Sequence, residues 1–464
     1  MSRQVEVAII GAGSAGLFAL SQVRRKTDNY VLIEGGELGT TCARVGCMPS
    51  KVMIQVAEDF HRKSIFDRQG IEGADELGLD IPAVMEHVQD LRDVFVDKTL
   101  GVTDALDEDH LIEGYARFID DHTIEVNGDR FTAGAVVIAT GTIPIIPDDW
   151  QSFRDDIITT EELFELEDLP GSVAVIGLGS IGLEIGQALS RLGVEVTGFD
   201  LLENVAKLND TVVNKFAIET IGKEFPLLLG EAARLEKTAE GIKVSAGDKS
   251  VVVEKVLASL GRRPNFDQLG LENTSLELDQ KGVPLFNPET MQCGNSSIYI
   301  AGDVNMDRPL LHEAGHEGRV AGYNAVRQGA QAFRRKTALA ITFCDPNIAT
   351  VGAQLNELDE SSIAIAEMQF GPVGRALIMG KNRGVLRVYV NKEDGLVLGA
   401  AMACVKGEHL AHLLAWSIQQ GMTVFDMLKM PYYHPVIEEA LQGALYGVLH
   451  DIDKKEETVE LEKL

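Results

Sequence analysis

The stretch that decides the fold is Gly11-Ala12-Gly13-Ser14-Ala15-Gly16. It follows an apolar run, Val5 to Ile10, and precedes a helical pattern of apolar residues, so the order is strand, G-x-G-x-x-G turn and helix. The next apolar run, 30–33, ends in Glu34, eighteen residues after Gly16. Such glycines let a pyrophosphate approach a helix N-terminus, and the acid binds ribose hydroxyls. The stretch predicts a dinucleotide-binding unit.

The same pattern occurs a second time. The apolar run Val173 to Ile176 leads into Gly177-Leu178-Gly179-Ser180-Ile181-Gly182, and the following strand, 194–199, ends in Asp200. Two complete units imply two dinucleotides. Asp200 should accept hydrogen bonds from an adenosine ribose and repel a 2′-phosphate, and residues 201–206 contain no Arg or Lys to pair with one. The second unit is therefore expected to bind NAD rather than NADP.

A cysteine pair lies just after the first unit, in Gly39-Thr40-Thr41-Cys42-Ala43-Arg44-Val45-Gly46-Cys47-Met48-Pro49-Ser50-Lys51. Residues five apart are separated by ~7.5 Å along a helix axis, whereas a disulfide needs Cα atoms within roughly 7 Å. If both cysteines lie on one helix, its first turn must be distorted, which Gly46 and Pro49 would ease. A strained, accessible disulfide is easily reduced. The pair is predicted to be redox-active, the alternative being two unrelated buried cysteines.

Composition narrows the function classes. The chain has 464 residues, 45% of them hydrophobic, which predicts two to four well-packed domains. Its net charge of -29 argues against nucleic acid and anionic membranes as partners. Five cysteines are too few for a disulfide framework, and no metal site is expected. No apolar run is long enough to span a membrane and no secretory leader is recognised, so a cytoplasmic protein is expected.

The rest of the chain alternates strand and helix patterns before changing character near residue 338. A boundary is expected near residue 150, after Pro144 and Pro147. Expected helices cover 52–66, 85–106, 311–327, 409–420, 423–430 and 435–450, and a charged tail covers 451–464. Expected strands cover 114–118, 123–126, 136–141, 251–260, 298–303, 342–343, 348–351, 363–368, 384–390 and 396–403. The final part is expected to be an α+β domain without a nucleotide fingerprint.

Taken together, these motifs resemble the class I pyridine nucleotide-disulfide oxidoreductases, and within them the dihydrolipoamide dehydrogenases. The resemblance covers residues 5 to about 450. It depends on both glycine turns, the cysteine pair followed by Pro49-Ser50-Lys51, and the motifs Ala139-Thr140-Gly141, Gly261-Arg262-Arg263-Pro264, Ala301-Gly302-Asp303 and Tyr433-His434-Pro435 with Glu439. It implies an α/β fold with two Rossmann-like domains, for FAD and NAD, and a C-terminal α+β dimerisation domain. The implied boundaries are 1–150 (FAD-binding, with the redox disulfide), 151–275 (NAD-binding), 276–337 (return to the FAD-binding or central domain) and 338–464 (dimerisation).

The resemblance also assigns cofactor-binding residues. FAD and NAD would be held by Gly11, Gly13, Ser14, Ala15, Gly16, Glu34, Thr41, Lys51, Gly114, Ala116, Thr140, Gly141, Asp303, Gly177, Gly179, Ile181, Gly182, Asp200 and Gly261.

Six residues match the family's catalytic positions. Cys42 would be the thiol that meets the substrate, and Cys47 would lie against the flavin. Lys51 would pair with Glu184 near the nicotinamide. His434 would be the base, oriented by Glu439, and would reach the cysteines from the other subunit of a homodimer. The implied activity is oxidation of dihydrolipoamide to lipoamide with NAD⁺.

The chain departs from the family pattern near both catalytic motifs. Thr40, Ala43 and Arg44 replace a glycine, an apolar residue and an asparagine, and Tyr432 and Val436 replace a histidine and a threonine. Arg44 could lower a thiol pKa, contact an acidic substrate or point to solvent.

Because these departures lie near the substrate, the substrate stays open. It is either a lipoyl dithiol, with a 2-oxo acid dehydrogenase complex as a candidate partner, or another disulfide such as glutathione disulfide reduced with NAD(P)H. A non-catalytic flavoprotein scaffold is the alternative of another class. Mercuric reductase is disfavoured because the last cysteine is Cys404.

Overall fold

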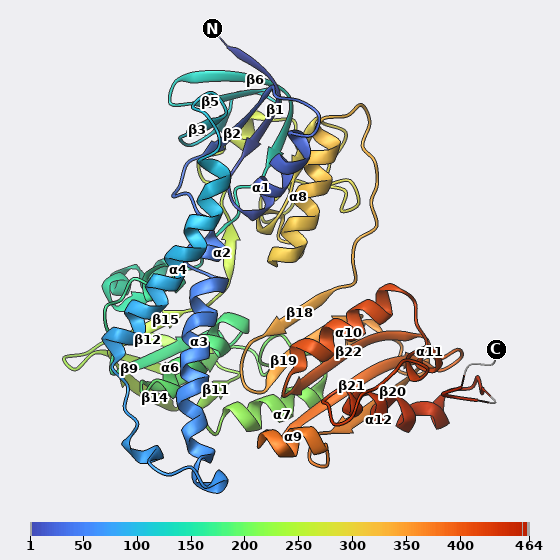
Figure 1. Cartoon of the computed structure of the whole chain (residues 1–464). Coiled ribbons are helices and arrows are strands. Elements are labelled where there is room, and N and C mark those ends of the chain that lie inside the picture. The colour runs from blue at the N-terminus through green and yellow to red at the C-terminus, as the bar shows by residue number, and fades with distance from the viewer. Residues whose placement is uncertain (1, 457, 462–464) are drawn as a thin grey trace.

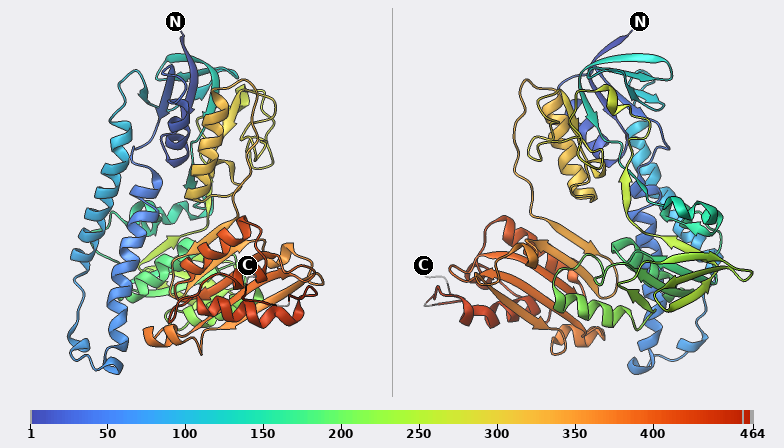
Figure 2. Two further views of the ribbon diagram at one scale, coloured as in Figure 1. Left: turned by 45° about the vertical axis from the view of Figure 1, so that its right-hand side comes forward. Right: turned by 180° about the vertical axis from the view of Figure 1, so that it is seen from behind.

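The chain folds into three units joined by long helices and a narrow two-stranded connection (Figure 1). The computed structural model describes residues 2–456 and 458–461. The N-terminal and C-terminal units lie at opposite ends of the molecule in all three views (Figures 1 and 2). No helix within the described ranges is both long and apolar enough to cross a membrane.

The first unit is a sheet whose central strands are parallel, in the order β3-β2-β1-β6, with β17 beside β6. The antiparallel β5 and β4 continue from β6. Its strands are β1 (Arg3–Ile10), β2 (Tyr30–Glu34), β3 (Leu111–Glu113), β4 (Arg117–Phe118), β5 (Thr123–Val126), β6 (Asp129–Ile138) and β17 (Ile298–Ile300). The expected strand 114–118 is wrong, because Gly114 (φ +151°) separates β3 from β4. The chain thus returns to this sheet through β17 after leaving it for more than a hundred residues.

Two helices pack side by side on one face of this sheet (Figure 1). They are α1 (Ser14–Val23) and α8 (Leu311–Ala325). A Cβ atom on Gly318 would lie 2.2 Å from the Ala15 carbonyl oxygen, and one on Gly322 would lie 2.3 Å from that of Ala19. Only glycine permits this close approach of two backbones. The glycines of α8 therefore fix the position of α1, the helix that follows the first nucleotide turn.

The second unit repeats the plan. Its parallel sheet has the order β11-β10-β9-β15-β8, and a three-stranded antiparallel sheet, β12-β13-β14, lies beside it. The elements are β8 (Ile157–Ile158), α5 (Thr160–Leu163), β9 (Ser172–Ile176), α6 (Ser180–Arg191), β10 (Glu195–Asp200), α7 (Thr211–Ile221), β11 (Leu227–Leu229), β12 (Arg234–Lys237), β13 (Ile242–Ala246), β14 (Lys249–Val253) and β15 (Lys255–Ala258). The two parallel sheets confirm the α/β fold class.

The expected single strand over 251–260 is wrong, because the chain changes sheets in its middle. β14 pairs antiparallel with β13, and β15 pairs parallel with β9. Glu254, between them, is fixed twice: its backbone N–H donates to Ser172 Oγ (2.9 Å), and its carboxylate accepts from the Gly171 N–H (2.8 Å).

Three helices and one small sheet connect the units. The helices are α2 (Thr41–Arg44), α3 (Cys47–His61) and α4 (Ile81–Thr103), and the small sheet pairs β7 (Thr142–Pro144) with β16 (Arg262–Pro264). α3 and α4 begin earlier than expected. For α4 the reason is local: the Asp80 side chain accepts from the Ala83 N–H, and Pro82 occupies the first turn. Short 3-10 turns cover Arg62–Ile65, Asp67–Gln69, Ala74–Glu76, Asp148–Asp156, Leu271–Asn273, Asp303–Asn305, Leu355–Glu357 and Leu449–Asp451.

The C-terminal unit is a five-stranded antiparallel sheet in the order β18-β19-β22-β21-β20. Its elements are β18 (Leu339–Thr342), β19 (Asn347–Gly352), β20 (Ile363–Gln369), α9 (Gly374–Met379), β21 (Gly384–Asn391), β22 (Val397–Cys404), α10 (Gly407–Gln419), α11 (Val424–Leu428) and α12 (Glu439–Val448). The expected helix over 435–450 is shorter, since residues 435–438 form a loop and turn. Of the expected tail, residues 452–456 and 458–461 form no helix, and residues 457 and 462–464 lie outside the described ranges.

Buried polar contacts attach the C-terminal unit to the second unit. The Asp210 carboxylate, fully buried, accepts from Arg387 Nη1 and from the Tyr389 hydroxyl, each at 2.8 Å. Asp210 also caps α7. Because a buried carboxylate is stable only when its oxygens are paired, this contact fixes β21 against α7. The residue boundaries of the domains remain predictions.

Candidate active site

The first glycine turn has the geometry that a dinucleotide needs. A Cβ on Gly11 would lie 2.3 Å from the Ala139 carbonyl oxygen, and one on Gly16 would lie 1.8 Å from that of Gly11. These two glycines are therefore required by packing. A Cβ on Gly13 would meet nothing within 4 Å, which leaves open space at the N-terminus of α1 for a ligand. Glu34 accepts from the Ala12 N–H at 2.6 Å, so its carboxylate lies beside that space.

The second turn matches the first closely. A Cβ on Gly177 would lie 2.4 Å from the Ser259 carbonyl oxygen, one on Gly182 would lie 1.9 Å from that of Gly177, and one on Gly179 would meet nothing. Asp200 accepts from the Leu178 N–H at 2.6 Å, as Glu34 does in the first turn. The predicted residue Ile181 is 40% exposed on the first turn of α6.

Further predicted cofactor residues lie around the first turn. Thr140 Oγ1 is buried without a hydrogen-bond partner in the described chain, and a Cβ on Gly141 would meet nothing. An orphaned buried hydroxyl beside open space fits a missing hydrogen-bonding ligand. Asp303 follows β17, and burial raises its carboxyl pKa. Together with the open glycine turn, these features fit FAD. The other predicted members are Ser14 and Ala15 on α1, Thr41 on α2, Gly114 and Ala116 after β3, and Gly261 before β16.

A buried network that the sequence analysis missed fixes the turn before Asp303. Glu317 on α8 accepts from the Gly302 N–H (2.8 Å) and from Asn305 Nδ2 (2.7 Å). Arg335 Nη2 donates to the other carboxylate oxygen of Glu317 at 2.7 Å. The only signal in the sequence was two acids, Glu313 and Glu317, among the small residues of α8.

Cys42 and Cys47 lie on two helical segments rather than on one. α2 ends at Arg44, and α3 begins at Cys47, after a break at Val45 and Gly46. A Cβ on Gly46 would lie 2.9 Å from the Thr41 carbonyl oxygen and 3.2 Å from Cys42 Cα. Glycine at 46 thus lets the start of α3 fold back onto α2, which brings the two cysteines together despite their spacing.

The two thiols are free and hydrogen-bonded to each other, which makes them unequal. The hydrogen bond from Cys42, helped by the charge of Lys51, lowers the pKa of Cys47 to about 7 although burial opposes this. The same hydrogen bond, together with burial, raises the pKa of Cys42. In the reduced pair, therefore, Cys47 is the thiolate and Cys42 is the protonated thiol.

Lys51 and Glu184 form an ion pair next to the cysteines. Lys51 Nζ lies 2.6 Å from Glu184 Oε2, so the pair joins α3 to α6. The other carboxylate oxygen of Glu184 accepts from the Phe343 N–H at 2.7 Å. Lys51 Nζ lies 4.8 Å from the centre of the Phe343 ring. Sequence reasoning missed Phe343, whose contact depends on the C-terminal unit packing against α6.

His434 and Glu439 also lie together. Glu439 Oε1 is 2.8 Å from His434 Nδ1, and Oε2 accepts from the Val436 N–H at 3.0 Å. The hydrogen bond with His434 holds the pKa of the Glu439 carboxyl below its usual range. The His434 side chain is 82% exposed. Its second ring nitrogen is thus free to reach another molecule.

Within one chain, the structure does not bring the two groups together. Cys42, Cys47, Lys51 and Glu184 cluster where α2, α3 and α6 meet. The segment before α12, which carries His434, belongs to the C-terminal unit at the other side of the molecule from α2 (Figures 1 and 2). A site that uses both must draw them from two subunits.

The residues that depart from the family pattern have local partners. Thr40 has φ +64°, a conformation that costs a β-branched residue about 1–3 kcal/mol, but its hydroxyl accepts from the Ala43 N–H and caps α2. Arg44 forms an ion pair with Glu37 and does not contribute to either thiol pKa. Of the three roles left open for Arg44, its ion pair with Glu37 disfavours the activation of a thiol. Tyr432 is half-buried, and its hydroxyl donates to the Met427 carbonyl oxygen at 3.4 Å.

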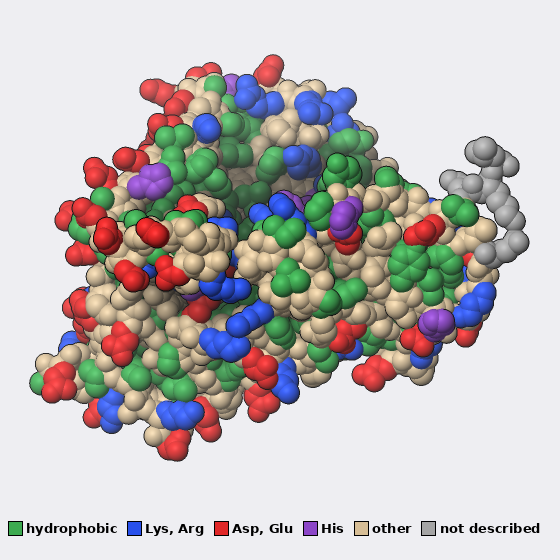
Figure 3. All heavy atoms as spheres, turned by 60° about the horizontal axis from the view of Figure 1, so that its bottom comes forward, with side chains coloured by type: hydrophobic (Ala, Val, Ile, Leu, Met, Phe, Trp, Pro, Cys, Tyr) green, Lys and Arg blue, Asp and Glu red, His purple; other side chains and the backbone are tan. Residues whose placement is uncertain are grey.

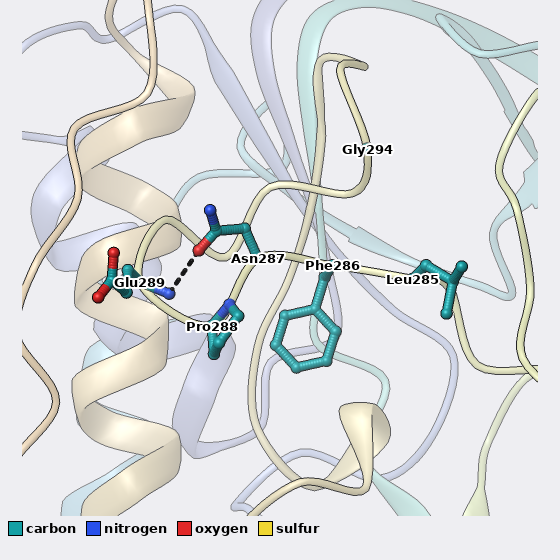
Figure 4. A pocket seen from close by; sticks show the side chains of 6 residues that line it. All are labelled: Leu285, Phe286, Asn287, Pro288, Glu289 and Gly294. Atoms are coloured by element: carbon teal, nitrogen blue, oxygen red, sulfur yellow. Dashed lines mark hydrogen bonds between the residues drawn. The ribbon is translucent and has the colours of Figure 1, made fainter.

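One hollow is unrelated to this cluster. It has a volume of about 580 Å³ and is lined by Leu285, Phe286, Asn287, Pro288, Glu289 and Gly294, where Asn287 accepts from the Glu289 N–H (Figure 4). None of the predicted site residues lines it. Among the residues that the structure describes, no group of three or more His, Cys, Asp or Glu side chains could hold a metal ion.

The unequal thiols give the first testable prediction. In the enzyme reduced by two electrons, the long-wavelength absorption of a thiolate beside oxidised flavin should appear as pH rises through about 7, because the lowered pKa makes Cys47 the anion above that pH. Lys51→Gln should raise this midpoint by about one unit, since it removes the cation and leaves the Glu184 carboxylate. Lys98→Gln, on the exposed face of α4, is the control. If the midpoint were the same in Lys51→Gln as in the unmodified enzyme, the assignment of Cys47 as the thiolate beside Lys51 would be contradicted.

Two nucleotide turns flanking a dithiol define an oxidoreductase that passes electrons between a thiol pair and dinucleotides. The comparisons with known proteins agree: residues 5–329 match the family described as pyridine nucleotide-disulphide oxidoreductase, and residues 339–445 match its dimerisation domain. The chain belongs to this family. It is therefore an FAD-containing enzyme that uses a nicotinamide dinucleotide and forms a homodimer through its C-terminal domain, as the predicted fold class and cofactors required.

Relatives named for different activities are about equally similar to this chain. The chain is 31% identical to dihydrolipoyl dehydrogenase 2 of Haloarcula marismortui over 464 residues, covering 95% of each chain. It is 28% identical to mercuric reductase of Staphylococcus aureus over 460 residues, covering 97% of this chain and 83% of the relative. The solved structure of LpdA from Mycobacterium tuberculosis has a TM-score of 0.84 at 23% identity, covering 96% of this chain and 99% of that one.

Proposed function

We propose that the protein catalyses reversible electron transfer between a dithiol and NAD⁺, with dihydrolipoamide as the dithiol. The observation that carries the proposal is the pair of unequal thiols beside the Lys51–Glu184 ion pair. A thiolate at Cys47 and a protonated thiol at Cys42 give the two cysteines separate tasks. The similarity to dihydrolipoyl dehydrogenases over nearly the whole chain supports the choice of substrate.

The reaction proceeds in two halves. A substrate thiolate attacks Cys42 Sγ, the Cys42–Cys47 bond breaks, and Cys47 leaves as a thiolate stabilised by Lys51. The second substrate thiol then attacks the mixed disulfide, which releases the cyclic disulfide and reduced Cys42. FAD held at the first glycine turn would supply the hydride chemistry that links the dithiol formed by Cys42 and Cys47 to NAD⁺. The balance is dithiol plus NAD⁺ to disulfide plus NADH and a proton.

His434 supplies the proton transfers. It removes the proton from the incoming substrate thiol and protonates Cys42 when Cys42 leaves the mixed disulfide. Cys42 is a protonated thiol in the reduced pair, so the reverse reaction needs the same base. Glu439 fixes the Nδ1 side of the ring and leaves Nε2 for the thiols. In this proposal the base comes from the second subunit of the homodimer, so the isolated subunit would lack dithiol turnover.

The second nucleotide turn predicts a preference for NADH. Asp200→Asn should lower the ratio of kcat/KM for NADH over NADPH by about 10- to 100-fold, since a charge-assisted hydrogen bond to ribose contributes roughly 1.5–3 kcal/mol and the negative charge repels a 2′-phosphate. Glu195→Gln, exposed at the other end of β10, should leave the ratio unchanged. Equal use of both coenzymes by the unmodified enzyme would contradict the assignment.

The substrate is tested by comparing rates. We expect the highest kcat/KM with dihydrolipoamide and NAD⁺, measured beside glutathione disulfide and other disulfides with NADH or NADPH. If another disulfide were turned over faster, dihydrolipoamide would be wrong as the substrate, but the class of reaction would stand. A lipoyl domain of a 2-oxo acid dehydrogenase complex is the proposed partner, in the cytoplasm, where reduced thiols persist.

A further inference from the structure

A second cavity, of about 430 Å³, lies where α3, α6 and the C-terminal unit meet. One side of the cavity is formed by residues spaced at helical intervals along α3, from Lys51 to Arg62 just past its end. At 1.5 Å per residue, these residues extend over about 16 Å. Gln187 and Arg191 of α6 form the second side, and the C-terminal unit closes the third. The cavity is thus a junction of three parts of the fold, and most of it lies well beyond the Lys51–Glu184 pair.

Its charges are unusual for so acidic a protein. Five cations line the cavity against three carboxylates, in a chain of net charge -29. The lining cations are Lys51, Arg62, Arg191, Lys381 and Lys406, and the carboxylates are Glu58, Asp345 and Glu408. On the face that Figure 3 shows, Lys and Arg side chains gather near the centre, and acidic ones are prominent around the edges.

Two of these cations, Lys381 and Arg191, are held in place by ion pairs. Lys381 Nζ bonds to Glu58 and lies 3.2 Å from Asp345 Oδ2. Arg191, only 6% exposed, donates to Glu224 through Nε (2.7 Å) and Nη2 (2.8 Å) and to Asp345 through Nη2 (3.2 Å). These bonds leave Nη1 of Arg191 without a partner in the described chain. The carboxylates therefore fix the cations without using all their donors.

Lys51 pairs with Glu184, but two other lining cations have no partner in the described chain. Arg62 and Lys406 are exposed at the rim of the cavity, and neither forms an ion pair or a side-chain hydrogen bond with any described residue. Lys406 has φ +55° and directly precedes α10, so the positive end of that helix lies on the same rim. An unpaired cation on each side, a helix N-terminus and a free guanidinium edge are the groups that bind a phosphate.

Part of the lining is apolar. Ile54 on α3 and Met379 at the end of α9 face the same cavity, as does Val405. A site that combines fixed cations with an apolar wall suits a ligand with an anionic group and a carbon skeleton. Inorganic phosphate alone would leave the apolar wall unfilled.

We propose that this cavity binds a small organic phosphate. The phosphate lies between Arg62, Lys381 and Lys406, and the carbon skeleton lies against Ile54 and Met379. Binding would connect α3 to the C-terminal unit. The cavity shares Lys51 and Phe343 with the dithiol site, but the residues that would hold the phosphate take no part in the dithiol chemistry, so the proposal does not depend on that chemistry.

The test is a calorimetric titration of the FAD-loaded dimer with glycerol 3-phosphate, in saturating NAD⁺ so that the nucleotide turns are occupied. We expect saturable binding of one ligand per chain, tighter than that of inorganic phosphate. The double variant Arg62→Gln/Lys406→Asn should weaken it by at least about tenfold, because it removes both unpaired cations. Asn tolerates the positive φ of Lys406, and both residues are exposed, so the fold should survive.

A matched control carries the same change in net charge. Arg68→Gln/Lys207→Asn also removes two exposed cations, one of them at positive φ (Lys207, +58°), outside the cavity. It should bind as the unmodified enzyme does, and so should Cys42→Ser, even though that variant loses dithiol turnover. Absence of saturable binding, equal or tighter binding of inorganic phosphate, or equal weakening by the control would overturn the proposal.

Discussion

Cys42→Ser is expected to abolish dithiol turnover, by about 10⁴-fold or more, and to preserve NADH oxidation with an artificial electron acceptor. Serine cannot form the disulfide, so Cys47 has no partner with which to accept or deliver an electron pair. The nucleotide turns and the Lys51–Glu184 pair stay intact, because Gly46 and α2 set the backbone there. Parallel assays with dihydrolipoamide and NAD⁺, and with NADH and the acceptor, measure the two activities.

Cys293→Ala is the control for this variant. Cys293 is buried in the first unit, away from α2, and its burial raises its thiol pKa to about 12, so it is not reactive. Both activities should survive its replacement. Dithiol turnover that persisted in Cys42→Ser would show that another group exchanges with the substrate, and a loss of both activities would point to a damaged flavin site.

His434→Gln should lower kcat for dihydrolipoamide by about 10²–10⁴-fold, the usual contribution of a general base. Glutamine can still hydrogen-bond to Glu439 but cannot take up a proton. Because the cysteines and nucleotide turns are untouched, NADH oxidation by an artificial acceptor should continue at its normal rate. Stopped-flow mixing with dihydrolipoamide, which follows reduction of the flavin through the dithiol, measures the affected step.

Two further variants make this prediction specific. Glu439→Gln should lower the same rate less, because the imidazole remains and loses only the carboxylate that orients it. His450→Gln, which changes another exposed histidine of the C-terminal unit, should have no effect. If His434→Gln kept full dithiol turnover, the base would have to come from elsewhere.

Both nucleotide units could be predicted because each depends on local chemistry. The glycines at 11, 16, 177 and 182 meet a carbonyl oxygen within 2.4 Å of a would-be Cβ, so no other residue fits and the pattern stays visible in the sequence. The acids that end β2 and β10 bond to the turns they follow, at the predicted distance along the chain.

The errors arose where tertiary contacts outweigh local pattern. Residues 251–260 are mostly apolar, but Glu254 in their middle bonds to Gly171 and Ser172, so the segment divides between two sheets. The role of Arg44 stayed open in the sequence, because its partner Glu37 is fixed only by the fold. Periodicity and spacing do not encode such long-range partners.

The sequence predicted which reactive side chains form the site, but not the residues that pack around them. Cys42, Cys47, Lys51 and Glu184 do cluster, whereas Phe343 and the Glu317–Arg335 pair come from segments that only the fold brings near. The same holds for the cavity between α3 and α6, whose cations are far apart in sequence. The assignment of roles to individual residues remains a prediction for experiment.

The central claim is that the cysteine pair stores an electron pair between substrate and flavin. An anaerobic reductive titration of the purified flavoprotein, followed by its absorption spectrum, tests this most directly. The enzyme should take up two electrons more per flavin than flavin alone requires, and Cys42→Ser should lose this extra capacity. If the unmodified enzyme took up no more than its flavin can hold, the relay through Cys42 and Cys47 would be contradicted.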